Sequence, residues 1–186
     1  MAEWIDADAA IATMRAARLE PLEPFDDADK PWRCRCLTCR RVVTPRLSSI
    51  GAGAGCKYCV TQGLDLNGPA IVFVLTHPEL NTHRLGFDAA DGDQLDRCAQ
   101  FGWVVAKTAK VPTVEDAYEI EAAVLRWLRL DLGLPEGAPS GLPDGARETT
   151  VPADAVTQAD LWARVSDELS RRRRRRRAAG GTRSGR

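Results

Sequence analysis

The sequence has no apolar run long enough to cross a membrane and no pattern of a secretion signal. Its longest apolar run, residues 70–75, has the length of a strand, whereas a membrane-spanning helix needs about 20 apolar residues. The first residues are acidic and lack the basic-then-apolar order of a secretory signal. With 44% apolar and 28% charged residues, the composition is that of a globular chain. We therefore expect a cytoplasmic protein with no membrane partner.

The sequence also lacks the short motifs that mark many enzymes. It contains no nucleophile elbow, P-loop or dinucleotide-binding glycine motif, and its only histidines are His77 and His83. A Cys–His nucleophile pair with Cys98 is one option, but Cys98 falls on the face of a short predicted helix that should be buried. Taken alone, residues 70–151 therefore carry only weak catalytic signals.

Acidic residues are missing from two blocks of the chain, although the formal net charge is zero. Residues 31–60 contain six basic residues and no acid, and residues 171–186 contain nine arginines and no acid. Concentrated basic blocks are typical of phosphate-binding proteins. Two other interpretations are that the blocks are solvated faces, or that the tail folds back on the acidic middle of the chain. We expect the Arg-rich tail, residues 171–186, to be disordered on its own.

Five of the six cysteines lie between residues 34 and 59, which in a cytoplasmic chain favours a metal site over disulfides. Cys36 and Cys39 form one CxxC pair, and Cys56 and Cys59 form another, 16 residues further on. Each pair lets a tight turn present two thiolates to one ion, and two pairs complete a tetrahedron. We therefore predict a closed, structural zinc site. Cys34 is a fifth thiol or an alternative ligand, and we prefer Cys36 because only Cys36 has the two-residue spacing to Cys39.

Basic and aromatic residues are interleaved with the cysteines. Trp32 and Tyr58 supply aromatic faces, and such a mixture suits contact with a nucleic-acid backbone. The alternative is that a small zinc module simply has a charged exterior. The absence of acids throughout the block favours nucleic acid. The candidate contact residues are Arg33, Arg35, Arg40, Arg41, Arg46 and Lys57.

Hydrophobic patterns predict an α+β domain over residues 69–170. Strands are expected at residues 70–76, 82–87 and 102–108, helices at 93–101, 113–132 and 157–170, and a short edge strand at 148–151. The order strand, strand, helix, strand, helix indicates a small antiparallel three-stranded sheet with helices on one face. The longest helix should be capped by Thr113 and should bury Ala117, Ile120, Val124, Leu128 and Leu132.

Two smaller segments are expected ahead of this domain. Residues 1–30 should hold a helix at residues 7–20 and then an acidic linker, because Pro21 and Pro24 end the helical pattern. Residues 31–62 should form the zinc-binding module.

The cysteine segment resembles a known kind of zinc module. The stretch Pro31-Trp32-Arg33-Cys34-Arg35-Cys36-Leu37-Thr38-Cys39, followed by Ile50-Gly51 and by Gly55-Cys56-Lys57-Tyr58-Cys59, is similar to the treble-clef zinc ribbons attached to bacterial and phage endonuclease-type domains. Those ribbons usually have glycine after the first CxxC, where this chain has Arg40.

The order of elements after the ribbon resembles the GIY-YIG nuclease fold, in particular its phage-associated branch. Val72-Phe73-Val74 falls where that family has its GIY strand, and Arg84-Leu85-Gly86 falls where it has YIG. Arg97 falls on the arginine of the family's first helix, and Glu121 falls on its helical glutamate. Glu148-Thr149 resembles the late strand of that branch, which contains a glutamate.

This resemblance implies Mg²⁺-dependent hydrolysis of a DNA phosphodiester. Glu121 would hold the divalent ion and Arg97 would stabilise developing negative charge. Phe73 and Arg84 stand at the two tyrosine positions of the family and have no hydroxyl for acid–base chemistry. Tyr118, one helical turn before Glu121, is the candidate substitute. In the alternative interpretation Glu121 is a solvated helix carboxylate and Arg97 forms a surface ion pair.

Three functions follow from these patterns. The first is a DNA endonuclease with a zinc-ribbon anchor, which Arg97 and Glu121 favour. The second is a non-catalytic DNA-binding protein on a decayed nuclease scaffold, which Phe73 and Arg84 favour. The third is a protein-interaction module, in which the acidic middle and the basic ends contact a partner or each other.

Overall fold

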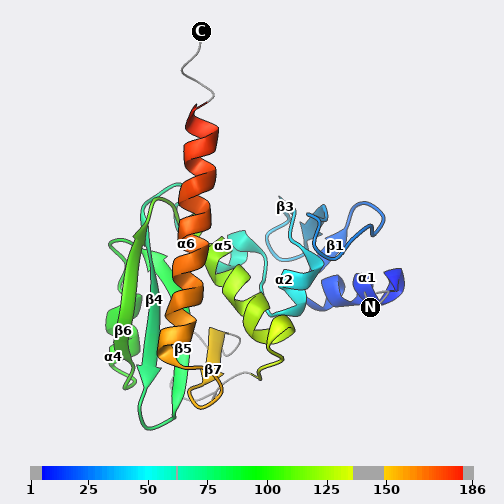
Figure 1. Cartoon of the computed structure of the whole chain (residues 1–186). Coiled ribbons are helices and arrows are strands. Elements are labelled where there is room, and N and C mark those ends of the chain that lie inside the picture. Colours follow the sequence, from blue (N-terminus) through cyan, green and yellow to red (C-terminus); the bar gives the residue numbers. More distant parts are fainter. Residues whose placement is uncertain (1–5, 62, 136–148, 182–186) are drawn as a thin grey trace.

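The computed structural model describes residues 6–61, 63–135 and 149–181, and it contains two sheets that lie on either side of one helix (Figure 1). The N-terminal part holds the cysteines, and the C-terminal part is built on a four-stranded sheet. Among the helices of these described residues, none combines the length and the apolar character that a bilayer crossing requires.

The cysteine module is a small three-stranded antiparallel sheet with short helices around it. Its elements are α1 (Ala7–Ala16), β1 (Leu19–Pro21), β2 (Cys34–Cys36), β3 (Val42–Val43), α2 (Leu47–Gly51) and α3 (Lys57–Val60), and the strand order is β1-β2-β3. Met14, Leu19, Trp32 and Ile50 are buried together with Cys34 in one core. The module therefore includes residues from the N-terminal segment as well as from the basic block.

The N-terminal segment differs from the prediction of a helix over residues 7–20 followed by a linker. The helix ends at Ala16, and Arg18 takes a left-handed conformation with a φ of 61°. The chain then turns back, so that Leu19 pairs with Cys36 in the sheet. The N-terminal segment packs onto the module because strands of two or three residues bury little apolar surface by themselves. Met14 and Leu19 add apolar side chains to the core of the module.

The larger sheet contains the three predicted strands and one more. Its strands are β4 (Ala70–His77), β5 (Thr82–Ala89), β6 (Val104–Val111) and β7 (Thr150–Pro152), all antiparallel in the order β6-β4-β5-β7. The short strand β7 lies at the edge, as the sequence predicts. Residues 136–148, including Glu148, lie outside the described residues.

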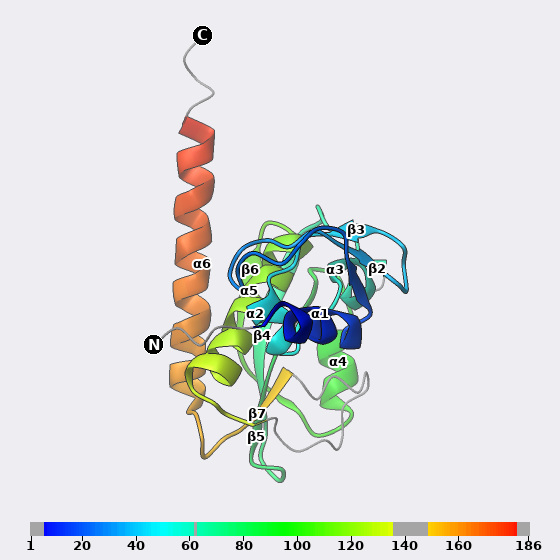
Figure 2. The ribbon, with the colours of Figure 1, turned by 90° about the vertical axis from the view of Figure 1, so that its right-hand side faces the viewer.

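Helices cover both faces of this sheet, so the prediction of helices on one face is wrong. Helix α5 (Val114–Arg126) and helix α6 (Gln158–Gly181) pack on one face, and α4 (Gln94–Ala99) packs on the other. Figure 2 shows α6 and α4 on opposite sides of the sheet. The reason is visible in β4, where Val72 faces α5 while Phe73 packs beside Cys98 of α4.

Helix α5 is capped as predicted, because the Thr113 hydroxyl accepts a hydrogen bond from the Asp116 backbone N–H. The first four residues of its predicted apolar stripe are fully buried or nearly so, but Leu132 is 44% exposed. Leu132 lies beyond a π-helical turn, Trp127–Asp131, which ends the helix and changes the direction of the following side chains.

Residues 171–181 of the arginine run continue helix α6, which packs on α5, and disorder of the tail on its own stays a prediction. The helix extends to Gly181 and projects beyond the sheet (Figure 1). Its first half buries Leu161 and Val165 against the sheet and α5. Ion pairs from Arg172 to Asp116 and Glu119 of α5 hold the second half in place.

Close contact between Phe73 and Gly86, which are direct partners across β4 and β5, gives a first prediction. A Cβ atom at Gly86 would lie 2.5 Å from the Phe73 ring. We expect Gly86→Ala to lower the free energy of unfolding by about 1–3 kcal/mol, because the ring has to move within a packed core. Gly51→Ala is the matched control, since a Cβ there meets no atom within 4 Å. Urea unfolding compares the two, and equal midpoints would contradict the packing argument.

Candidate functional site

Four cysteine sulfurs converge in the N-terminal module. The Sγ atoms of Cys36, Cys39, Cys56 and Cys59 all lie within 4.8 Å of one another. Cys36 and Cys59 are 3.6 Å apart, and Cys39 and Cys56 are 3.7 Å apart. In a tetrahedral site with metal–sulfur bonds of about 2.3 Å, neighbouring sulfurs are about 3.8 Å apart. The cluster can therefore hold a metal ion such as zinc.

Each CxxC pair is held by a tight backbone turn. The Arg40 N–H donates to the Cys36 carbonyl at 2.9 Å, and the Cys59 N–H donates to the Cys56 carbonyl at 2.9 Å. Arg40 closes the first turn with a φ of 63°, in the left-handed region. These two turns bring both thiols of each pair to the same side, as the spacing predicts.

The electrostatics of the cluster favour a bound cation. Burial and the neighbouring thiols raise the pKa of Cys59 to about 12. Burial opposes ionisation of Cys36 as well, but backbone N–H groups of Cys39 and Thr38 lower the pKa of Cys36 to about 6. Cysteines bind a metal ion as thiolates, and four thiolates this close together repel one another unless a positive ion compensates their charge.

Cys34 lies outside the cluster and belongs to the core of the module. It is fully buried, and burial is the main reason why its pKa rises to about 11. Cys34 and Cys36 point to the same side of β2, but only Cys36 reaches the other three sulfurs. All six cysteines are free of disulfides.

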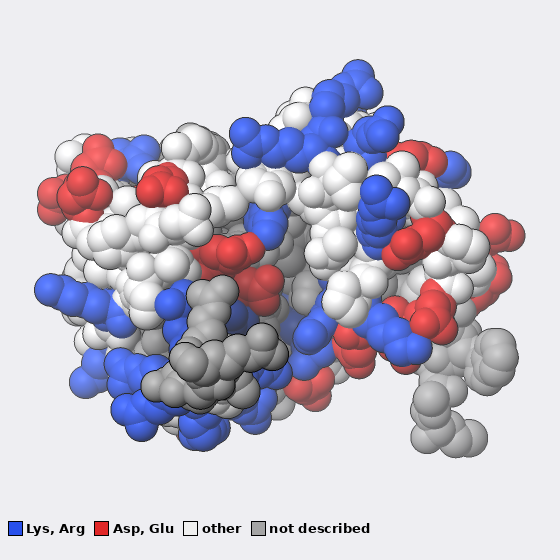
Figure 3. All heavy atoms as spheres, turned by 90° about the horizontal axis from the view of Figure 1, so that it is seen from above, with Lys and Arg blue, Asp and Glu red and all other residues white. Residues whose placement is uncertain are grey.

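The predicted basic surface divides into two parts. Arg33, Arg35, Arg40, Arg41 and Arg46 are exposed on the module, and Figure 3 shows basic side chains gathered there. The Arg41 guanidinium lies over the Tyr58 ring, 4.6 Å from its centroid. Lys57 is half-buried and forms an ion pair with Glu115 of α5, so it belongs to the contact between the two halves of the molecule.

Three polar contacts fasten the cysteine module to helix α5. They lie near the beginning, the middle and the end of the helix, and they fix the space between the module and the larger sheet. The contacts are the Lys57–Glu115 ion pair, a hydrogen bond of 2.7 Å from the Tyr118 hydroxyl to the Gly55 carbonyl, and an ion pair of 2.8 Å between Arg126 and Asp29.

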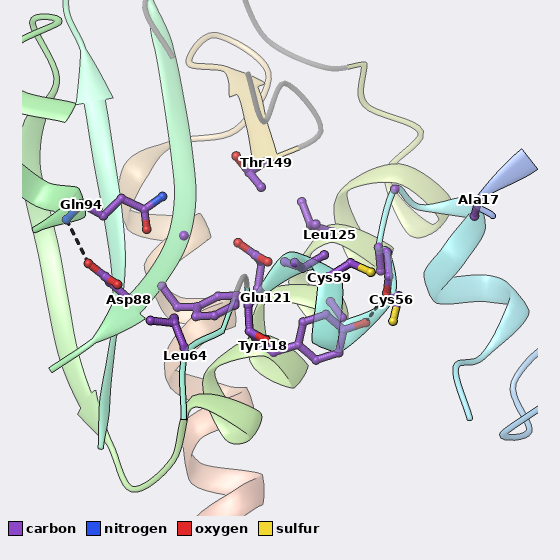
Figure 4. A pocket seen from close by; sticks show the side chains of 18 of the residues that line it. Ala17, Cys56, Cys59, Leu64, Asp88, Gln94, Tyr118, Glu121, Leu125 and Thr149 are labelled. Carbon is purple, nitrogen blue, oxygen red and sulfur yellow. Dashed lines mark hydrogen bonds between the residues drawn. The ribbon is translucent and has the colours of Figure 1, made fainter. Parts of the chain in front are cut away.

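A cleft of about 610 Å³ lies between the module and the larger sheet. One wall contains the two cysteine turns, and the other contains β5, α4 and α5 (Figure 4). Strand β7 pairs with β5 only from Thr82 to Arg84. Beyond Arg84, Gly86, Phe87 and Asp88 of β5 line the cleft.

The four residues predicted for catalysis all line this cleft. Arg84 comes from β5, Arg97 from α4, and Tyr118 and Glu121 from α5. Arg84 is 2% exposed and Glu121 is 7% exposed, and Figure 4 shows the Glu121 carboxylate pointing into the middle of the cleft. The Arg84 Nε–H donates to the hydroxyl of Thr149, 3.3 Å away, which also lines the cleft.

Arg97 and Tyr118 have partners that limit what they can do. Arg97 lies at the rim, where its Nε pairs with Asp93 at 3.0 Å. The Tyr118 hydroxyl is fully engaged with Gly55, and burial raises the pKa of Tyr118 well above its ordinary value. Tyr118 is therefore suited to joining α5 to the cysteine module and poorly suited to proton transfer.

The cleft also contains residues that sequence analysis did not identify. Asp88 is buried, and its carboxylate accepts hydrogen bonds from the backbone N–H groups of Ala89 and Gln94, which fixes the start of α4. Arg18 lines the opposite wall and is exposed. No sequence signal marks Arg18, because its place depends on the return of β1 onto β2.

Comparison with known proteins adds no relative. We found no protein-family model, curated protein or solved structure that matches the chain. The function is therefore inferred from the cleft, which places a sulfur cluster on one wall and two arginines with a buried carboxylate on the other.

The contact between Tyr118 and Gly55 gives a second prediction. We expect Tyr118→Phe to lower the free energy of unfolding by about 0.5–1.5 kcal/mol, because the Gly55 carbonyl loses its donor. Tyr58→Phe is the matched control and should leave stability unchanged, because its ring contacts with Arg41 and Lys57 do not need the hydroxyl. Thermal unfolding in the presence of zinc measures the stability of both variants. If Tyr118→Phe is as stable as the wild type, the Tyr118 hydroxyl does not join α5 to the cysteine module.

Proposed function

We propose that the chain is a Mg²⁺-dependent DNA endonuclease of the GIY-YIG type, anchored to DNA by a zinc ribbon. The observation that carries the proposal is the convergence in one cleft of Arg84, Arg97 and Glu121, which come from a strand and two helices. The family resemblance assigns all three residues to its motifs.

The arrangement of the sheet supports the resemblance. The motif Val72-Phe73-Val74 lies in β4 and the motif Arg84-Leu85-Gly86 lies in the neighbouring β5. The two strands pair with Phe73 opposite Gly86, where the absence of a side chain makes room for the aromatic ring. The glycine of the second motif thus has a physical role, because any side chain at this position would displace the Phe73 ring.

The first cysteine turn supports the zinc-ribbon part of the proposal. Arg40 occupies the position where similar ribbons have glycine, and its φ of 63° is the left-handed conformation that glycine adopts most easily. The turn therefore keeps its shape despite the departure in sequence. Four thiolate ligands leave no open coordination position, so the zinc would be structural.

The cleft contains suitable groups for a phosphodiester and a hard cation. Mg²⁺ prefers carboxylate oxygens, water and phosphate oxygens, and Glu121 is the carboxylate that points into the cleft. When bound, the ion would neutralise charge on the scissile phosphate. The guanidinium groups of Arg84 and Arg97 would hold phosphate oxygens as negative charge develops.

A second candidate function, non-catalytic DNA binding, is favoured by the state of the aromatic side chains. Phe73 is fully buried against α4, on the side of the sheet away from α5. Arg84 replaces the other tyrosine, and the Tyr118 hydroxyl is held by Gly55. Activation of water would therefore have to come from Glu121 and the metal ion, without help from a tyrosine at the family's positions.

The cysteine cluster gives a third prediction. We expect one zinc ion per purified chain, measured by metal analysis, and we expect Cys39→Ser to fall well below that value and to unfold the module. Cys34→Ala is the control and should keep its zinc, because Cys34 lies outside the cluster. Equal zinc loss in both variants would contradict the ligand set.

Plasmid nicking in Mg²⁺ or Mn²⁺ gives a fourth prediction. We expect metal-dependent nicking that EDTA abolishes and that Glu121→Gln reduces about 100-fold or more. Glu79→Gln is the control, because Glu79 is an exposed carboxylate in the turn between β4 and β5 and does not line the cleft. Nicking that persists in Glu121→Gln would overturn the role of Glu121. A gel shift of the plasmid without any nicking would favour the second candidate function.

A further inference from the structure

The run of arginines at residues 171–177 lies in the second half of helix α6. Two interpretations of this block are a phosphate-binding segment and a tail that folds back on the acidic middle. Each interpretation applies to a different face of the same helix.

The inner face folds back on α5. Arg172 pairs with Asp116 and Glu119, and Arg176 pairs with Asp116. Residues four apart lie on the same side of a helix, so these two arginines together hold α6 on the first turn of α5. Their charge is compensated inside the molecule.

The outer face has no such compensation. Arg173, Arg174, Arg175 and Arg177 are exposed, and within the described part of the chain none of them has a carboxylate within ion-pair distance. With a rise of about 1.5 Å per residue, the four guanidinium groups share roughly 6 Å of helix axis. Such a concentration of like charge is costly for the helix alone and favourable beside a polyanion.

The place of this face in the molecule indicates its partner. Figure 3 shows basic side chains around the end of α6 and a second basic group over the cysteine module, both on the same face of the molecule. The outer face of the arginine turns has no large apolar side chain that could enter a bilayer. A dense group of exposed guanidinium groups instead suits the phosphates of a nucleic-acid duplex.

We propose that Arg173, Arg174, Arg175 and Arg177 form a second DNA-backbone contact, outside the cleft, and that Arg172 and Arg176 hold it in position. The proposal builds on the proposed function, because the cleft would receive the strand to be cut while α6 binds the phosphates of the flanking duplex. The contact carries no base specificity and contributes affinity that depends strongly on salt.

The test uses the full-length, zinc-loaded protein and a fluorescent DNA duplex, with affinity measured by anisotropy over a range of salt concentrations. In the variant R173Q/R174Q/R175Q/R177Q we expect the slope of log affinity against log salt to become shallower by about 3–4, since each phosphate contact contributes about 0.9. The thermal midpoint should not fall, because these side chains make no ion pairs in the described chain. Lysine at the same four positions should keep most of the slope. An unchanged slope in the glutamine variant would overturn the proposal.

Two further arms separate this proposal from the nuclease proposal and from membrane binding. If the wild-type protein nicks no plasmid but the glutamine variant still loses salt slope, the α6 contact is supported and the nuclease proposal fails. If the wild-type protein nicks DNA normally but the salt slope does not change in the glutamine variant, the nuclease proposal stands and the α6 contact is overturned. Co-sedimentation with phosphatidylserine vesicles that requires the four arginines, while the DNA slope does not change, would overturn the DNA contact in favour of a membrane surface.

Discussion

The convergence of four cysteine sulfurs within 4.8 Å is the constraint on which the N-terminal half depends. Its strands have two or three residues each, too few to be stable without further support. A bound cation would join the two backbone turns and fix the loop that ends at Cys56. Because the carbonyl that accepts the Tyr118 hydroxyl belongs to this loop, the position of one wall of the cleft follows from the geometry of the sulfurs.

Helix α5 connects the cysteine module to the larger sheet. One side of the helix packs Ile120 and Val124 into the core of the larger sheet, and another side carries Tyr118 and Glu121 toward the cysteine module. The same first turn that meets Lys57 also receives the arginines of α6. A single helix therefore sets the distance between the two walls and the direction of the buried carboxylate.

Much of the fold and part of the site could be predicted from local patterns. The strands of the larger sheet, the Thr113 cap and the four clustered cysteines follow from periodicity and spacing, which a sequence displays directly. The packing of α4 on the second face, the strand at Leu19 and the place of Arg18 depend on contacts between distant segments. The helical arginine run was missed because its stability comes from Asp116 and Glu119, about 50 residues earlier in the chain.

The core of the cysteine module has a consequence for the order in which the chain acquires structure. All its members lie between Ala10 and Cys59, so every contact that it needs has been synthesised before the first strand of the larger sheet emerges. Chains generally fold from the N-terminal unit onward during synthesis. With a metal ion bound, the module would be complete while α5 is still unmade, and the helix would then dock on a finished surface. In that order the cleft would be assembled last, when its second wall is added.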